Sequence, residues 1–243
     1  MDVCVHEVTM AQAMDTIAGF IAEGKPHHVV TLDASMCVAA RHDPELRAVI
    51  WGAELVTPDS AGVLWAAGRF GIRLPERVSG VEIVAELAAG APRTGISLYL
   101  LGAAPGVAEE AARKLLDAHP GCRIAGTHHG YFAAEDDAFV VEQVRQTRPD
   151  VLCVAMGIPK QEKWIARHRD ALGIPVMIGV GGTLDVLSGR ARRAPLWMRR
   201  TNLEWLYRVL VNPRKIGKVM TLPRFVAMVL SDRAQRDENP RVQ

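Results

Sequence analysis

Residues 151–164, VLCVAMGIPKQEKW, change from apolar to polar at their middle, and this change predicts the fold. The apolar half ends at Gly157 and predicts a short strand buried on both faces, as in a parallel sheet. Pro159 suits the first turn of a helix, and Lys160 and Gln161 follow it at once. A lysine and an amide beside the N–H groups of a helix start favour an anionic ligand. Capping and solvation of the helix explain the same residues equally well.

The rest of the chain repeats this alternation of strand and helix. It predicts an α/β fold with a Rossmann-like, mainly parallel sheet and flanking helices. We expect a core at residues 1–189, in halves of about 1–90 and 91–189, and a basic helical appendage at 190–243. The further strands are expected at 28–33, 54–57, 96–101, 123–127 and 175–180, and the helices at 9–23, 35–49, 61–69, 81–89, 107–118, 135–146 and 161–171.

Polar residues and glycines follow several of these strands, at the edge where a parallel sheet gathers its carboxyl ends and binds ligands. Thr31, Asp33 and Asp59 are therefore expected at one edge. Asp59 precedes a helix, so helix capping and catalysis explain its carboxylate equally well. Gly181 and Gly182 permit either close approach of a ligand or a tight turn.

Nucleotide and metal motifs give weaker signals. Asp185 follows a strand end, where it can accept a hydrogen bond from a ribose hydroxyl or a base N–H. The turn at 102–106 resembles a nucleotide-binding turn only weakly, because the chain contains neither GxGxxG nor GxxxxGK[ST]. His128 and His129 are adjacent, but no further ligands stand at zinc-motif spacing, so we expect no metal there.

The cysteines and the N-terminal residues indicate a compartment. The four cysteines show no CxxC spacing, and two of them lie inside apolar runs, where a buried free thiol is the default. This usage predicts a reducing environment. The start lacks the pattern of a signal peptide, and no apolar run approaches roughly 18 residues. We therefore expect a cytoplasmic protein whose membrane contact is peripheral.

Charge is divided unevenly along the chain. Residues 1–189 contain 16 Lys/Arg and 23 Asp/Glu, whereas residues 190–243 contain 13 and 4. The segment 190–218 holds nine basic residues and one acid, interleaved with leucine and aromatic residues. This composition is typical of a helix at an anionic membrane surface. A helix docked on the sheet with its basic face in water is the alternative, and no motif supports nucleic-acid binding.

Nine short motifs stand in order along nearly the whole chain. Together they resemble the WecG/TagA/CpsF glycosyltransferases, which form glycosyltransferase family 26. The motifs are TLDA at 31–34, TPDSAGVLWA at 57–66, RVSG at 77–80, LLG at 100–102, GYF at 130–132, MGIPKQEKWI at 156–165, GVGGTLDVLSG at 179–189, RRAP at 192–195 and LEWLYR at 203–208.

The resemblance implies a function and its partners. A sugar of the N-acetylmannosamine, N-acetylmannosaminuronic acid or glucose type would pass from a UDP-sugar to a polyprenyl-diphosphate-linked acceptor. The transfer would occur at the inner face of the cell membrane, in cell-wall or exopolysaccharide biosynthesis. The resemblance further implies inversion at the anomeric carbon, with no metal and no cofactor.

Site residues carry over by position. The resemblance implies that Asp59 is the general base, with Arg77 and Gln161 as further catalytic residues. Thr31 and residue 33 match the sugar site, and Tyr131 and Asp185 match positions near the uridine. Further substrate-binding positions are Gly102, Gly157, Lys160, Gly181 and Gly182, and those for the acceptor or the membrane are Arg193, Arg208, Lys215 and Lys218.

Some positions depart from the family pattern. Position 33 is usually Asn, and Asp33 loses two amide donors and adds a charge, which bears on the donor sugar. Glu82 stands where Asp is common. Lys215 and Lys218 stand where arginines are usual, which weakens bidentate recognition of phosphate.

Two other functions compete with this one. A Rossmann-type dehydrogenase is disfavoured because no GxGxxG opens a helix. A non-catalytic nucleotide-binding adaptor is the other. The sequence does not decide the oligomeric state, so a homo-oligomer remains open.

Overall fold

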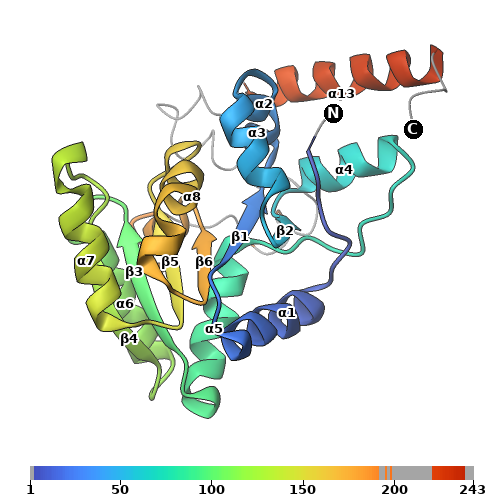
Figure 1. The fold of residues 1–243 in the computed structure, drawn as a ribbon. Coiled ribbons are helices and arrows are strands. Elements are labelled where there is room, and N and C mark those ends of the chain that lie inside the picture. The colour runs from blue at the N-terminus through green and yellow to red at the C-terminus, as the bar shows by residue number, and fades with distance from the viewer. Residues whose placement is uncertain (1–2, 192–194, 196–197, 199–220, 239–243) are drawn as a thin grey trace.

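The computed structural model describes residues 3–191, 195, 198 and 221–238 of the chain (Figure 1). They form one six-stranded parallel sheet in the order β2-β1-β6-β5-β3-β4, which confirms the predicted α/β, Rossmann-like class. β6 lies between β1 and β5, so a strand of the second half pairs with the first strand of the chain. The strands are β1 His27–Leu32, β2 Leu55–Pro58, β3 Ser97–Gly102, β4 Arg123–His128, β5 Val151–Ala155 and β6 Val176–Gly179.

Helices cover both faces of this sheet. Every residue of five strands is buried, and only the edge strand β4 is partly open to solvent. Successive residues of a strand enter opposite layers: Val29 packs with α1, α5 and α9, and Val30 packs with α2, α3 and α4. The helices are α1 Met10–Glu23, α2 Ala34–His42, α3 Pro44–Trp51, α4 Ala61–Arg69, α5 Gly80–Thr94, α6 Val107–Ala118, α7 Asp137–Thr147 after the short 3₁₀ turn Ala134–Asp136, α8 Lys160–Leu172, α9 Thr183–Leu187 and α13 Thr221–Glu238.

Two helix predictions were wrong in detail. The helix expected at 35–49 is divided, because Asp43 ends α2 and accepts a hydrogen bond from the N–H of Leu46 at 3.0 Å, which caps α3. Pro44 then occupies the first turn of α3. The helix expected to close before Pro92 continues to Thr94, since a proline near the end of a helix removes only one backbone bond.

Helix α13 packs on the core beside α2, as Figure 1 shows. Phe225 and Val229 are fully buried in the same hydrophobic cluster as Met36 of α2 and Val63 of α4. A guanidinium nitrogen of Arg41 lies 2.8 Å from a carboxylate oxygen of Asp232. This part of the predicted appendage is therefore attached to the core by apolar packing.

Candidate active site

The carboxyl ends of all six strands meet at one edge of the sheet. Parallel register places Leu32 opposite Pro58, Val30 opposite Gly179, and Gly102 opposite Ala155. Arg77 lies in the connection between α4 and α5. The other candidate residues that the structure describes lie in or just after these strand ends: Thr31, Asp33, Asp59, Gly102, Tyr131, Gly157, Lys160, Gln161, Gly181, Gly182 and Asp185.

Asp59 follows β2 and precedes α4, but it does not cap that helix. The N-cap is Ser60, whose hydroxyl accepts a hydrogen bond from the N–H of Val63 at 3.4 Å. The N–H of Asp59 bonds to the carbonyl of Leu32 at 2.9 Å, which fixes its backbone against the end of β1. Of the two explanations that the sequence left open for Asp59, helix capping therefore belongs to its neighbour.

Arg77 lies in the turn that passes the end of β2. The N–H of Val78 bonds to the carbonyl of Pro58 at 2.9 Å. Glu82 holds this turn together, because its carboxylate accepts from Arg77 Nη2 at 3.1 Å and from the hydroxyl of Ser79 at 2.6 Å. Arg77 is thereby placed near the strand end that carries Asp59.

The amino end of α5 faces the end of β1. A Cβ added to Gly80, the first residue of α5, would lie 3.4 Å from Thr31 Oγ1 and 3.5 Å from Thr183 Oγ1. The amino end of a helix carries partial positive charge, which favours a negative group nearby. The start of α5 therefore favours a negative group here, while the charge of Arg77 is partly balanced by Glu82.

Thr31 and Asp33 both make structural contacts at the edge. Thr31 is buried and donates its hydroxyl hydrogen to the carbonyl of Gly179 at 2.7 Å, which joins β1 to β6. Asp33 caps α2 by accepting from the N–H of Met36 at 2.7 Å. Asparagine, the usual residue at position 33, could make the same cap through its oxygen.

Gln161 was predicted to contact substrate, but the structure buries it: the residue is only 1% exposed. Its Oε1 accepts from the N–H groups of Gly157, at 3.1 Å, and Gly181, at 3.0 Å. The loops after β5 and β6 are thus joined through one amide oxygen. Gln161 therefore holds these two loops together from a buried position.

Two residues beneath Gln161 were missed by the sequence analysis. Glu162 is 0% exposed and His28 is 2% exposed, and the His28 Nε2 and Glu162 Oε2 atoms lie 2.8 Å apart. Glutamate at a helix start usually indicates a solvated first turn, so no local pattern distinguishes this buried contact.

Lys160 and Tyr131 lie on the β4 side of the edge. Lys160 Nζ donates to the carbonyl of Gly130 at 3.4 Å and lies 5.2 Å from the ring centre of Phe132. Tyr131 is 74% exposed, so a face of its ring is accessible to a ligand. A lysine ammonium and an exposed aromatic ring can serve a phosphate and a base, respectively.

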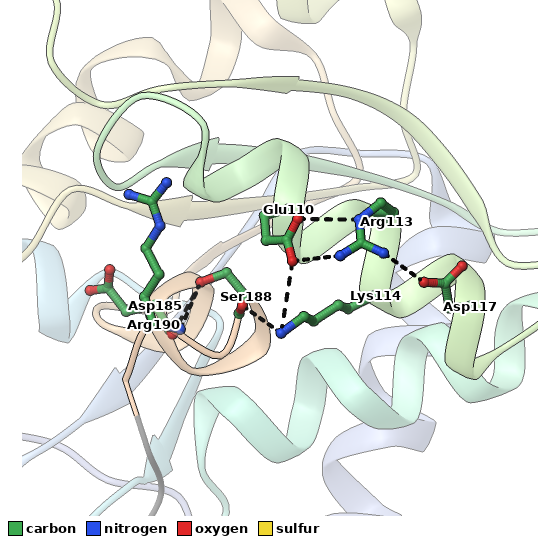
Figure 2. A network of polar contacts seen from close by, with 7 residues as sticks. All are labelled: Glu110, Arg113, Lys114, Asp117, Asp185, Ser188 and Arg190. Atoms are coloured by element: carbon green, nitrogen blue, oxygen red, sulfur yellow. Dashed lines mark hydrogen bonds and ion pairs between the residues drawn. The ribbon is translucent and has the colours of Figure 1, made fainter.

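Asp185 lies in α9, and the turn that follows α9 is fixed to α6 (Figure 2). Lys114 Nζ donates to the carbonyl of Ser188 at 2.7 Å, and the hydroxyl of Ser188 donates to the carbonyl of Asp185 at 3.1 Å. Figure 2 shows the side chains of Asp185 and Arg190 extending away from Lys114. The contacts of Lys114 therefore hold Asp185 without using its carboxylate.

The remaining candidates, Arg193, Arg208, Lys215 and Lys218, lie outside the described residues. The structure does describe residues on either side of segment 192–220, including Arg190 and Thr221. Arg190 follows the β6 end of the sheet, and the hydroxyls of Thr221 and Ser35 lie 3.4 Å apart beside the end of β1. Both points of attachment are therefore at the carboxyl edge of the sheet.

In the part of the chain that is described, no three His, Cys, Asp or Glu side chains are grouped to hold a metal ion. All four cysteines are free, and burial raises the pKa of the Cys153 thiol to about 12. A thiol with that pKa stays protonated and unreactive at neutral pH. None of the described helices has the length and apolarity needed to cross a membrane.

Comparison with known proteins agrees with the nine sequence motifs described above. Residues 1–239 match the model of the glycosyl transferase WecG/TagA/CpsF family. A Bacillus subtilis (strain 168) protein named N-acetylglucosaminyldiphosphoundecaprenol N-acetyl-beta-D-mannosaminyltransferase is 33% identical over 204 residues, 84% of this chain and 79% of that protein. A Staphylococcus aureus (strain NCTC 8325 / PS 47) protein of the same name is 34% identical over 221 residues, 90% of this chain and 86% of that protein. The chain therefore belongs to the WecG/TagA/CpsF family of glycosyltransferases.

Proposed function

We propose that the protein transfers a hexose from a UDP-sugar to a polyprenyl-diphosphate-linked saccharide, with inversion at the anomeric carbon. The observation that carries the proposal is the position of Asp59. It stands at the carboxyl edge of the sheet, beside the turn of Arg77, while Ser60 caps the helix in its place. Helix capping, the other role that the sequence leaves open for Asp59, is therefore performed by Ser60.

The chemistry follows from these positions. Asp59 takes the proton of the acceptor hydroxyl as the hydroxyl oxygen attacks the anomeric carbon, and the bond from that carbon to the UDP oxygen breaks. The electron pair leaves with UDP. Negative charge grows on the diphosphate, where Arg77, Lys160 and the amino ends of the edge helices can stabilise it. One displacement of this kind inverts the anomeric centre.

We assign uridine recognition to Tyr131 and Asp185, which follow other strands of the edge than Asp59 does. Tyr131 is exposed and offers a ring face on which a base can stack. Asp185 can accept from a ribose hydroxyl or a base N–H, and its backbone is held through Ser188 and Lys114. An added Cβ at Gly181 or Gly182 would meet no atom of the described residues within 4 Å, which gives a ligand room to approach the backbone.

Among the three donor types, N-acetylmannosamine is the one that we favour. The two relatives described above carry that sugar in their names. Asp33 argues separately against the uronic acid, because a second carboxylate near its own would be repelled. N-acetylmannosamine and glucose have no such charge, and between these two the names of the relatives support N-acetylmannosamine.

We propose that the reaction occurs at the inner face of the cell membrane. The polyprenyl chain of the acceptor stays in the bilayer, so the protein must come to the surface. The excess of positive charge after residue 189 suits an anionic surface, and both described attachments of segment 192–220 lie at the carboxyl edge of the sheet. We propose that this segment contacts the membrane and the acceptor diphosphate.

The test is a transfer reaction with the purified full-length protein, a short-chain polyprenyl-diphosphate N-acetylglucosamine acceptor and a panel of UDP-sugars. Mass spectrometry should show the acceptor extended by one N-acetylhexosamine from UDP-N-acetylmannosamine, with EDTA leaving the rate unchanged. UDP binding without product from any donor would favour the adaptor. Binding of NAD without binding of UDP would favour the dehydrogenase.

A further inference from the structure

The carboxylate of Glu162 is buried beneath the carboxyl edge of the sheet and makes contacts in two directions. One oxygen accepts from Gln161 Nε2 at 2.9 Å, and the other lies 2.8 Å from Nε2 of His28. Glu162 is 0% exposed, so both contacts are shielded from water. A buried carboxylate is costly without hydrogen-bond partners, and these two contacts supply them.

These contacts determine which way the amide of Gln161 points. The N–H groups of Gly157 and Gly181 can only donate, so they must face the amide oxygen. Glu162 can accept, so it holds the amide nitrogen on the other side. If the amide turned over, its nitrogen would face two N–H donors and its oxygen would face a carboxylate oxygen.

The sheet is shaped to admit this pair. A Cβ added to Gly179 of β6 would lie 2.1 Å from Glu162 Oε1 and 2.8 Å from Gln161 Nε2. Only glycine leaves the space that the two side chains occupy. The carbonyl of the same glycine accepts from Thr31 at 2.7 Å, so the pair also adjoins a residue of the sugar site.

We propose that Glu162 is a positioning residue for donor binding. It orients Gln161, Gln161 joins the loops at Gly157 and Gly181, and these loops present their open backbone to the UDP-sugar. The inference rests on the proposed function, because it takes the ligand of the loops to be UDP. A purely structural role would predict a different outcome: lower stability with unchanged affinity in the folded protein.

Two substitutions and one matched control separate these roles. Glu162→Met keeps a side chain of similar length and removes both acceptors, whereas Glu162→Gln retains an oxygen that can accept from Gln161. The control is Asp150→Ala. Asp150 accepts from the N–H and hydroxyl of Ser97, at 2.7 and 2.8 Å, and lies at the opposite edge of the sheet.

The measurements are thermal unfolding, UDP affinity by calorimetry and hydrogen exchange at the amides of Gly157 and Gly181. Glu162→Met should raise the Kd for UDP about tenfold, because Gln161 loses the acceptor that orients its amide. Glu162→Gln should raise it about threefold, because a neutral amide oxygen is a weaker acceptor than a carboxylate. Without UDP, hydrogen exchange at the amides of Gly157 and Gly181 should be faster in the Glu162 variants than in the wild type. Asp150→Ala should lower the unfolding temperature and leave the UDP affinity unchanged.

A folded Glu162→Met variant with wild-type affinity for UDP and wild-type exchange would overturn the proposal. If Glu162→Met does not fold, Glu162→Gln decides: a raised Kd supports the positioning role, and an unchanged Kd contradicts it. A wild-type protein that binds no UDP would instead refute the proposed function. In that case the exchange rates still show whether Glu162 holds the two loops.

Discussion

Two glycines at the carboxyl edge of the sheet leave no room for a side chain. At Gly102, φ is 134° and an added Cβ would lie 2.4 Å from the carbonyl oxygen of Ala155. At Gly179, it would collide with the carboxylate of Glu162. The edge therefore depends on glycine for space, and at Gly102 for backbone conformation as well.

Gly102→Ala should accordingly lower the free energy of unfolding by about 2–4 kcal/mol, through backbone strain and overpacking. Gly19→Ala is the matched control, because Gly19 lies inside α1 and a Cβ added there would meet no described atom from outside the helix's own backbone within 4 Å. That change should raise the free energy of unfolding by about 0.5–1 kcal/mol. Urea unfolding measures both free energies. If Gly102→Ala changed the free energy of unfolding by the same amount as Gly19→Ala, the carbonyl of Ala155 would not exclude a side chain at position 102.

The sequence identified the polar residues of the edge but not all of their contacts. Asp59 and Ser60 are adjacent and both can cap a helix, so only the backbone direction distinguishes them. Gln161 was predicted to face a ligand because it stands at a helix start, where free backbone N–H groups also point. Its burial depends on two glycine N–H groups from separate loops, a contact between distant residues that local sequence does not encode.

Helix α13 shows how an element far along the chain completes the core. Phe225 is fully buried, with its ring 6.4 Å from that of Trp65 in α4. Phe225→Ala should therefore lower the free energy of unfolding by about 3–5 kcal/mol. Leu230→Ala, at a position that is 46% exposed on the same helix, should change it by no more than about 0.5 kcal/mol. If the two variants have the same urea midpoint, α13 does not contribute to the core in solution.

The contact between α3 and α8 predicts a dependence on pH. Lys163 Nζ lies 2.7 Å from Asp43, and this hydrogen bond, with the one from the N–H of Leu46, lowers the pKa of Asp43 below its ordinary 3.8. A carboxylate with a lowered folded pKa stabilises the fold above the unfolded pKa, and that stabilisation is lost as the pH falls through the folded pKa.

Asp43→Asn tests this dependence, because asparagine keeps the helix cap and removes the charge. The variant should be less stable than the wild type at neutral pH, and the difference should disappear in acid below pH 3.8. Thermal unfolding across that range measures it. A difference that is constant with pH would mean that the charge of Asp43 contributes nothing.

Strands and most helices could be predicted because apolar runs and helical spacing are local signals. The Asp43-Pro44 pair divided an expected helix, since a capping residue followed by proline starts a new one. Helix α9 was not predicted, because five residues after two glycines carry no recognisable period. The strand order also escaped prediction, since placing β6 between β1 and β5 depends on contacts that span most of the chain.

The distribution of charge over the whole molecule predicts salt-sensitive binding to anionic membranes. Removing everything after residue 189 would also remove α13 and expose the core around Phe225, so charge substitution is the cleaner test. Changing Arg192, Arg193, Arg199 and Arg200 to glutamine should weaken sedimentation with anionic liposomes, at on the order of 1 kcal/mol per charge.

Changing the exposed Arg113 and Arg145 of α6 and α7 to glutamine provides the control and should have little effect. Raised salt should release the wild type from anionic liposomes. Binding that survives both high salt and the four substitutions would exclude an electrostatic attachment through this segment.

The proposed transfer at the sheet edge is tested most directly by comparing the wild type and Asp59→Asn in the same reaction, with the mass of the lipid product as the readout. The variant should form product about 10²- to 10⁴-fold more slowly, because it has lost the general base, while its affinity for UDP is retained. Ser60→Ala should lose helix stability and keep its turnover. Near-normal product formation by Asp59→Asn would contradict the proposed role of Asp59 and the mechanism built on it.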